Sequence, residues 1–380
     1  MNPGNAYLDL HILQTVPPSC LNRDDTNSPK TAVYGGVRRA RVSSQSWKRA
    51  TRLRFNATLP EDAVGTRTRK LPDLISDRVA ALAPDAEAER VAQLSAKAAG
   101  AMIGMDDKAI KKMLEADGPP QLPYALFLPT AVVAAAADHV AAAVRSGEEP
   151  DGTVLRGLLA GQEGHTLDIA LFGRMVATSP DMNVDAACQV AHAISTHAVS
   201  QEFDFFTAVD DVAVAEDETG AAMMGYVEFA SATLYRYATV NIAALVDNLG
   251  GSGPVPAACR LFTEAFARSL PTGKQNTFAA HTPPDVVLAV LRTDQPVSLV
   301  GAFERPVRGQ DGHVAESARR LAEHAAALDD AYGALSGGGW YTATSAAGDL
   351  SAPLGGSSVS FPTLLDAVEG AVAATAAARG

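Results

Sequence analysis

The stretch VRRARVSSQSWKRATRLRF, residues 37–55, changes from the period of a strand to that of a helix. Arg39 and Arg41 would share one face of a strand, because side chains alternate between the two faces of a sheet. Ser43 or Ser44 would then cap the first turn of a helix. This helix would carry three further cations, Lys48, Arg49 and Arg52. The stretch therefore predicts a strand followed directly by a helix, with basic side chains fixed on both.

The sequence before this stretch predicts a strand and a long loop. In AYLDLHILQT, residues 6–15, Leu8, Leu10 and Ile12 alternate with Tyr, Asp and His, which is typical of a half-buried strand. Residues 17–36 are rich in Pro, Asn, Asp, Ser and Gly, which favour turns. We therefore expect a strand that opens the sheet, followed by an ordered surface loop.

The sequence after this stretch predicts a helical insertion and a hairpin. Residues 60–180 read as alanine-rich helices broken by Pro and Gly, one of them capped by Thr130 and ending near Gly147. Apolar residues in 184–199 are spaced three and four apart, so we expect an amphipathic helix that covers the sheet. Two β-rich runs on either side of an acidic turn at 216–220 predict a hairpin arm.

The last part of the chain completes an α+β architecture of layers. Further strands are expected at residues 234–240, 285–292 and 296–302, and helices at 255–270 and 311–333. Residues 336–359 are rich in Gly and Ser and predict a loop, after which an alanine-rich helix closes the chain. No repeat of fixed period is visible, so any repetition would come from assembling copies.

The chain is acidic overall but carries one basic segment near its N-terminus. Its formal net charge is −12, whereas residues 20–70 hold twelve Lys or Arg against four Asp or Glu, which leaves −20 for the remainder. This asymmetry favours a local anionic partner on a protein whose other surfaces avoid nucleic acid. A solvated helix face is the alternative explanation for such a run of charge.

The composition is that of a globular protein, with 47% hydrophobic and 19% charged residues. No apolar run is long enough to span a membrane, and the N-terminus lacks the basic and apolar regions of a signal peptide. Cys20, Cys188 and Cys259 form no C-x-x-C pair, which argues against a disulfide framework and a zinc site. We expect a cytoplasmic protein without membrane contact.

The sequence shows no set of reactive groups typical of an enzyme. His192 and His197 lack the HExxH spacing of a zinc protease, and LPTGKQN at 270–276 lacks the complete glycine loop that binds nucleotide phosphates. GGSG at 250–253 matches the GxxG of KH domains but reads as a turn in a chain with 31 glycines. Two acidic pairs lack companion ligands for Mg²⁺, Asp24 with Asp25 and Asp210 with Asp211. We expect no catalytic residue, metal or cofactor.

Residues 17–49, PPSCLNRDDTNSPKTAVYGGVRRARVSSQSWKR, resemble the N-terminal signature of the CasC family. This family, part of the seventh family of Cas proteins, supplies the repeated backbone subunit of the type I-E CRISPR Cascade complex. The resemblance continues in blocks at 167–177, 186–199, 204–211, 235–245 and 270–292. It implies a hand-like protein with a ferredoxin-like, RRM-related palm sheet, an inserted helical finger domain and a β-hairpin thumb. The implied boundaries are palm 1–59, fingers 60–180, palm helix 181–199, thumb 200–228 and palm 229–380.

The resemblance also implies a non-catalytic scaffold that serves antiviral defence. Copies would stack head to tail along the crRNA and present it to the paired target DNA strand. The other partners would be the large, small, repeat-processing and 5′-handle-binding Cascade subunits, while a separate nuclease-helicase cleaves the target. A subunit repeated along a guide must grip phosphates and leave the base edges free.

The basic segment supplies the candidate RNA-binding residues. Its charges are Arg23, Lys30, Arg38, Arg39, Arg41, Lys48, Arg49 and Arg52. Ser43, Ser44, Gln45 and Ser46 would add hydrogen-bond donors at a helix N-terminus, a favourable place for phosphate. Contact with a neighbouring subunit is the alternative role for any of these residues.

The hairpin supplies candidates that displace a base at intervals along the guide. Phe205 and Phe206 are the candidate thumb aromatics, and Met175 matches the methionine that the family packs at the displaced base. Core packing is the alternative for these three, and Met223 and Met224 are further candidates. The acidic thumb residues would reach a basic surface of the next copy or avoid phosphate; they are Asp210, Asp211, Glu216, Asp217 and Glu218.

Two other functions remain open at this stage. An RRM-fold endonuclease that processes CRISPR RNA would share the sheet and the basic surface, and His281 is the best candidate for its acid or base. A sequence-specific DNA regulator would need a helix-turn-helix or another groove reader, and none is apparent.

Overall fold

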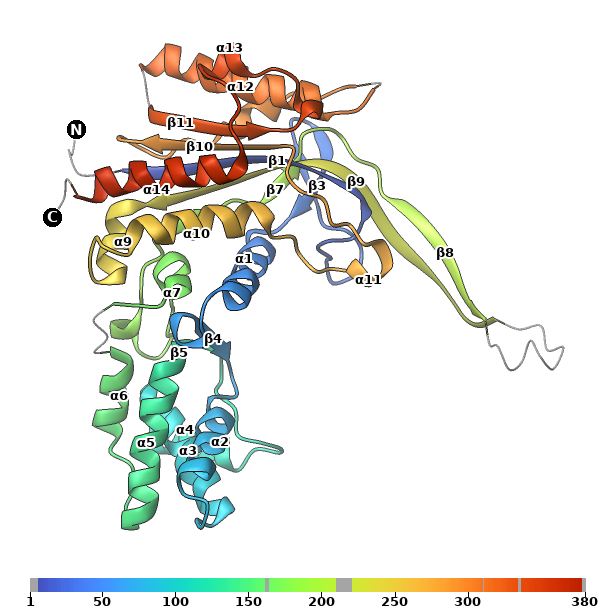
Figure 1. Ribbon diagram of the computed structural model, residues 1–380. Helices are drawn as coiled ribbons and strands as arrows, with labels where there is room; N and C mark the ends of the chain where they lie inside the picture. The colour runs from blue at the N-terminus through green and yellow to red at the C-terminus, as the bar shows by residue number, and fades with distance from the viewer. Residues whose placement is uncertain (1–5, 161–163, 210–220, 310, 334–335, 378–380) are drawn as a thin grey trace. The chain divides into compact units, whose positions relative to one another are not determined.

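The computed structural model describes residues 6–160, 164–209, 221–309, 311–333 and 336–377 (Figure 1). The chain forms two compact units. The sheet unit comprises Met1–Arg54, Gln189–Asn241 and Pro256–Arg379, and the helical unit comprises Phe55–Cys188 and Ile242–Val255. No helix among the described residues is long and apolar enough to cross a membrane.

The sheet unit is built on an antiparallel sheet with the strand order β11-β10-β1-β9-β7-β3-β2. Its strands are β1 (Tyr7–Ser19), β2 (Thr31–Tyr34), β3 (Val37–Val42), β7 (Ala193–Ser195), β9 (Ala221–Asn241), β10 (Val286–Arg292) and β11 (Ser336–Ala343). Two short additions pair with β9 off this path, β6 (Cys188–Val190) and β8 (Glu202–Val209). The mixed α+β class that the sequence predicts is confirmed.

Helices cover both faces of this sheet (Figure 1). One face carries α10 (Val255–Arg268) and α14 (Phe361–Ala377), and the other carries α12 (Val314–Tyr332) and α13 (Ser351–Leu354). The expectation of a half-buried first strand is therefore wrong. Leu8, Leu10 and Ile12 are fully buried, but so are Asp9 and His11 on the opposite face. Period-2 alternation marks a strand without showing that its polar face meets water.

A network of polar side chains occupies the α12 face of the sheet. Arg292 Nε donates to Asp9 Oδ2 at 2.8 Å, and the Tyr237 hydroxyl donates to Asp9 Oδ1 at 3.1 Å. His11 Nδ1 lies 3.0 Å from the Tyr235 hydroxyl. Burial raises the pKa of Asp9, and its hydrogen bonds and the Arg292 cation oppose that rise. These contacts replace the hydration that each group loses in the core.

Three predicted elements of the sheet unit are wrong. Residues 184–199 form the short strands β6 and β7 instead of a helix, because β7 pairs with β3 on one side and β9 on the other. Such pairing outweighs helical spacing. The strand expected at 296–302 is the 3-10 helix η3 (Leu299–Phe303), and the loop expected at 336–359 contains the edge strand β11 and α13.

The loop expected at 17–36 contains the end of β1, the strand β2 and the turn that joins β2 to β3 in a hairpin. Gly35 and Gly36 form the tight turn of this hairpin with φ +59° and +76°, which suits glycine at both central positions. A Cβ on Gly35 would lie 1.7 Å from the carbonyl oxygen of Glu304, so no other residue fits there. The turn is thereby held against the segment that follows η3.

The helical unit confirms the helices expected over residues 60–180. Its helices are α2 (Leu71–Leu82), α3 (Ala88–Met102), α4 (Asp107–Leu114), α5 (Thr130–Ser146), α6 (Gly152–Ala160), α7 (Leu167–Phe172) and α9 (Ile242–Leu249). A two-stranded sheet joins β4 (Gly65–Thr68) to β5 (Leu126–Pro129). Thr130 is the first residue of α5 but does not cap it as predicted, because Pro129 holds the cap position without a side-chain hydrogen bond. Gly147 ends the helix in the left-handed conformation. The core is aliphatic and alanine-rich, with Leu94 and Val133 among its members.

Candidate nucleic-acid interface

The loop that precedes β2 is held in shape by its own polar groups. Asp24 Oδ1 accepts from the backbone N–H groups of Thr26 and Ser28, each at 3.0 Å. Hydrogen bonds from the Thr26 side chain, and then from these N–H groups, lower the pKa of Asp24. Arg23 Nη1 donates to Asn27 Oδ1 at 2.5 Å across the same loop. Arg23 is therefore exposed on an ordered loop, as the sequence predicts.

The predicted cations of this segment come from three elements: the loop before β2, β3 and α1 (Ser44–Thr58). Arg23, Arg38 and Arg49 are exposed, and Lys30, Arg41, Lys48 and Arg52 are half-buried. The loop and β3 are joined where the Arg41 N–H donates to the Lys30 carbonyl at 2.9 Å. Lys30 and Arg41 line one shallow hollow together with Ser19 and Asn22. The structure thus leaves seven of the eight predicted cations at least partly exposed on these elements.

Arg39 differs from the other predicted cations because it is completely buried. Its Nε donates to the Tyr34 carbonyl at 3.1 Å, Nη1 to Ser195 at 3.0 Å, and Nη2 to Phe303 at 2.8 Å. Burial lowers its pKa, against the opposing influence of Tyr34 and Glu304. The structure therefore does not support Arg39 as a phosphate ligand: the guanidinium joins β2, β7 and η3.

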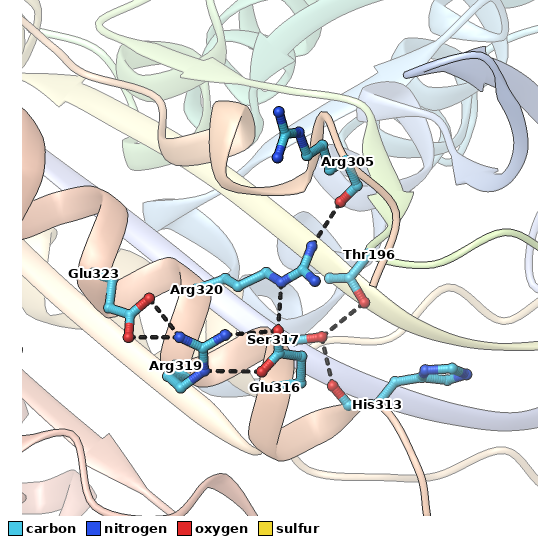
Figure 2. A network of polar contacts seen from close by, with 8 residues as sticks. All are labelled: Thr196, Arg305, His313, Glu316, Ser317, Arg319, Arg320 and Glu323. Atoms are coloured by element: carbon cyan, nitrogen blue, oxygen red, sulfur yellow. Dashed lines mark hydrogen bonds and ion pairs between the residues drawn. The ribbon is translucent and has the colours of Figure 1, made fainter. Parts of the chain in front are cut away.

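The segment that Arg39 holds is also fixed from α12 (Figure 2). Arg320 Nη1 donates to the Arg305 carbonyl at 2.9 Å, and Arg320 Nε donates to Glu316 at 2.6 Å. The Ser317 and Thr196 hydroxyls are hydrogen-bonded at 2.8 Å, next to the end of β7. The basic strand β3 is therefore held, through Arg39, by β7 and η3, which α12 fixes in turn. All three elements lie far from β3 in the sequence.

The predicted serine cluster caps α1. The backbone N–H of Ser46 donates to Ser43 Oγ at 3.3 Å, and Ser43 is buried. This confirms Ser43 as the capping residue and leaves its hydroxyl engaged within the protein. The Ser44 N–H donates to His192 Nδ1 at 3.3 Å. Burial lowers the pKa of His192, as do the nearby Arg41 and Lys30 cations, which keeps the imidazole neutral and able to accept. Gln45 is exposed and Ser46 is half-buried.

A buried arginine that the sequence analysis did not identify anchors α1 to the sheet. Arg236 of β9 lies between two rings, with its Cζ 3.7 Å from the Trp47 ring centroid and 4.5 Å from that of Phe266. Its Nη1 donates to Gln14 Oε1 at 2.6 Å, and its Nη2 donates to the Phe266 carbonyl. Burial lowers its pKa to about 9. The signal that could have found it is a charged residue within an otherwise apolar strand run.

The hairpin of β8 and β9 presents apolar side chains to solvent. Phe205 is 52% exposed and pairs across the strands with Tyr226, with ring centroids 5.2 Å apart. Phe206 is half-buried, because its ring covers Gly225 on the opposite strand. Phe203, Met223 and Met224 are also exposed on this hairpin. Core packing thus does not account for Phe205. The predicted acidic residues at 210–218 lie outside the described residues.

Met175 lies in the helical unit and is 79% exposed. It follows the glycine that ends α7, and the buried neighbour Arg174 fixes its segment. Arg174 Nε donates to the Met182 carbonyl at 2.9 Å, and Nη2 donates to the Leu159 carbonyl at 3.2 Å. An ordered segment thus holds an apolar side chain in solvent, which core packing does not explain.

Reactive groups do not converge in the described part of the chain. Within it no cluster of His, Cys, Asp and Glu could hold a metal ion. His281, the candidate for an endonuclease, is exposed, and its imidazole has no hydrogen-bond partner among the described residues. No observation therefore favours the endonuclease over an RNA-binding role.

A family model described as CT1975-like protein matches residues 8–367 of the chain. The chain belongs to this family. No curated protein sequence matches the chain. Two solved structures resemble it over nearly its whole length. A chain of a "CRISPR RNA-guided surveillance complex, pre-nicking" is 34% identical with a TM-score of 0.85, covering 96% of this chain and 100% of its own.

The second structure extends the same relationship. It is a chain of a "CRISPR RNA-guided surveillance complex" that is 29% identical with a TM-score of 0.75, covering 96% of this chain and 99% of its own. Both alignments are essentially full-length, so the likeness concerns the whole CT1975-like fold. The predicted kinship with chains of CRISPR surveillance complexes is confirmed.

Proposed function

We propose that the chain is a crRNA-binding subunit of a type I-E CRISPR Cascade complex, equivalent to the CasC backbone subunit. The observation that carries this proposal is the set of exposed and half-buried cations on the loop, β3 and α1, here called the cationic surface, on a fold shared with surveillance-complex chains. Arg23, Arg38 and Arg49 are exposed there without a base-reading element beside them. This arrangement suits RNA of any sequence, because phosphate contacts carry no sequence information.

The cationic surface would hold the guide through its backbone. If each copy contacts about three phosphates, the affinity for single-stranded RNA falls by roughly two log units per tenfold increase in salt. A row of copies multiplies this effect and makes release of the guide slow. The acidic remainder of the chain, −20 in net charge outside residues 20–70, would keep other surfaces off nucleic acid.

The hairpin would set the shape of the bound guide. Phe205, Tyr226 and Met224 are exposed apolar side chains that can take the place of a stacked neighbour. Stacking on such a side chain contributes about 1–3 kcal/mol per base, which offsets the displacement of one base but not of every base. Because each copy has one such hairpin, a row of copies would displace one base of the guide at each regular interval. Met175 would act at the same displaced base.

The subunit would be a scaffold without catalytic residues, metal or cofactor. Copies that meet head to tail through different surfaces form open helical rows, as a linear guide requires. The row would present the crRNA to the target DNA strand in the cytoplasm, together with the large, small, repeat-processing and 5′-handle-binding subunits. The acidic residues at 210–218 would reach a basic surface of the next copy or avoid phosphate.

Copurified RNA tests this function. The chain is produced with a CRISPR transcript and its sister subunits, and the length and nuclease protection of bound RNA are measured. We expect RNA of uniform length, lost when Arg38 and Arg41 are both changed to Glu. The control reverses two exposed cations elsewhere, Arg145→Glu and Arg308→Glu, with the same change in charge. Absence of RNA from the unmodified complex at moderate salt would contradict the proposal.

A further inference from the structure

The loop between α10 and β10 contains two residues with unusual backbone conformations. Lys274 has φ +47° and Ala279 has φ +46°, at the two ends of the short helix α11 (Gln275–Phe278). Asn27 is the only other non-glycine residue with positive φ among the described residues. Glycine would adopt this conformation without the steric penalty that a Cβ brings. A lysine at such a position suggests that its side chain is needed there.

The strained conformation is imposed by contacts within the loop. The Gln275 side chain donates to the Pro271 carbonyl at 3.2 Å and accepts from the Ala280 N–H at 2.8 Å. Phe278 packs on Phe229 at the base of the hairpin, with ring centroids 5.8 Å apart. The loop is therefore rigid on both sides of Lys274. Strain that a rigid surrounding imposes is concentrated at ligand-binding sites.

The loop lies directly against the basic segment. Gly273 packs on residues 20 and 21: a Cβ there would be 2.3 Å from the Leu21 carbonyl oxygen and 2.7 Å from that of Cys20. Burial raises the pKa of the Cys20 thiol, and the Arg23 and Lys274 cations both oppose that rise. The two cations therefore lie close to one thiol, and the carboxylates of Glu228 and Asp24 act on it more weakly. Lys274 forms no ion pair among the described residues.

We propose that Lys274 is a further phosphate-binding residue, which the strained loop fixes so that it and Arg23 contact the same stretch of RNA backbone. This inference rests on the proposed function. Lys274 is half-buried, and Asn276 and Thr277, which follow it closely in the chain, are exposed with amide and hydroxyl donors. The loop would thus add a second segment to the interface. This segment is distant from the N-terminal cations in the sequence but adjacent to residues 20 and 21 in the fold.

The test separates charge from conformation at this one position. The purified chain binds fluorescein-labelled oligouridine, and affinity is measured by anisotropy against salt concentration, with thermal unfolding measured in parallel. Lys274→Gly removes the ammonium and the strain together, so we expect the salt slope to fall by about 0.7 while the melting temperature stays level or rises. Lys274→Arg keeps the charge and should keep the slope. Arg308→Ala, which removes an exposed cation elsewhere, is the matched control.

The outcomes are distinct for the two proposals. An unchanged slope in Lys274→Gly, with normal binding by the unmodified chain, overturns the role of Lys274 and leaves the proposed function standing. A fall in melting temperature together with lost binding also overturns it, because it shows a structural role. If the unmodified chain binds no oligouridine and its complex carries no crRNA, the proposed function itself fails.

Discussion

The guanidinium of Arg236 lies 3.7 Å from the ring centroid of Trp47, and both side chains are fully buried. This contact joins the central strand β9 to α1, the helix that carries Lys48, Arg49 and Arg52. It is a cation–π contact between fully buried groups, and such contacts are strongest where the groups are desolvated. This buried pair is therefore one of the contacts that fix the position of the cationic helix.

Removal of the Trp47 ring should destabilise the fold. We expect Trp47→Ala to lower the free energy of unfolding by about 3–5 kcal/mol, because it leaves a cavity and exposes one face of a buried cation. Urea unfolding measures this change. Leu53→Ala on the same helix removes an exposed side chain and should change the free energy by less than about 0.5 kcal/mol. Equal effects of the two substitutions would contradict the anchoring role.

Neighbouring arginines of β3 should behave in opposite ways. Arg39→Ala leaves several buried carbonyl groups unpaired, at about 1–3 kcal/mol each, and should lower stability strongly. Arg41→Ala should leave the urea midpoint nearly unchanged but reduce the salt slope of RNA binding by about 0.7. Unfolding and anisotropy titrations of both variants check this. Similar salt slopes and stabilities for the two variants would show that burial does not separate their roles.

The stability of the sheet unit should fall in acid. Burial lowers the pKa of His11 to about 3, and the Arg292 cation acts in the same direction. The unfolded chain takes up a proton near pH 6.5, whereas the folded chain does so near 3, so stability is lost as pH falls between these values. The maximum slope is about 1.4 kcal/mol per pH unit. His197, whose pKa burial also lowers, adds in the same sense.

Urea midpoints measured from neutral to acidic pH test this origin. His11→Phe should reduce the pH dependence, and the exposed control His281→Gln should leave it unchanged. A pH dependence that is the same in all three proteins would place the acid sensitivity elsewhere.

Phe205 should affect the shape of the guide without affecting stability. Its ring is 52% exposed, so Phe205→Ala should hardly change the melting temperature. Loss of stacking should weaken RNA binding by about 1–3 kcal/mol for each displaced base. The base should then return to the stack, which is detected as reduced fluorescence of 2-aminopurine placed at that position. Thr207→Ala, exposed on the same strand, is the control. Unchanged fluorescence in Phe205→Ala would assign the displacement to other residues.

His281 should be dispensable for any processing of RNA. We expect the purified chain to leave CRISPR repeat RNA intact without added metal, as seen on denaturing gels, and His281→Ala to behave identically. Discrete cleavage that disappears in the variant would instead support the endonuclease.

The period of the sequence predicts the elements whose environment is simple. β1, α1, α10, α12 and α14 appear where the spacing of apolar residues places them. The spacing fails at β7, because its partners β3 and β9 come from distant parts of the chain. The local sequence shows neither that β11 pairs with β10 at the edge of the sheet nor that helices cover both faces of β1.

The candidate site shows the same limit. Arg39 and Arg41 share a strand face by period, yet one is buried and the other is half-exposed. The difference arises because the segment after η3, more than 250 positions away, places its carbonyl groups over Arg39 alone. Arg23, Arg38 and Arg49 could be identified from charge because each of them stays exposed in the fold.

The central position of β1 bears on how the protein is made. This first strand lies between β9 and β10, so its two neighbours leave the ribosome only after residues 241 and 292 have been synthesised. The basic segment that follows β1 also folds late, because the hydrogen bonds of the buried Arg39 include one to the Phe303 carbonyl. The nascent chain therefore carries its cations unfolded through most of translation, and the finished cationic surface appears only when synthesis is nearly complete.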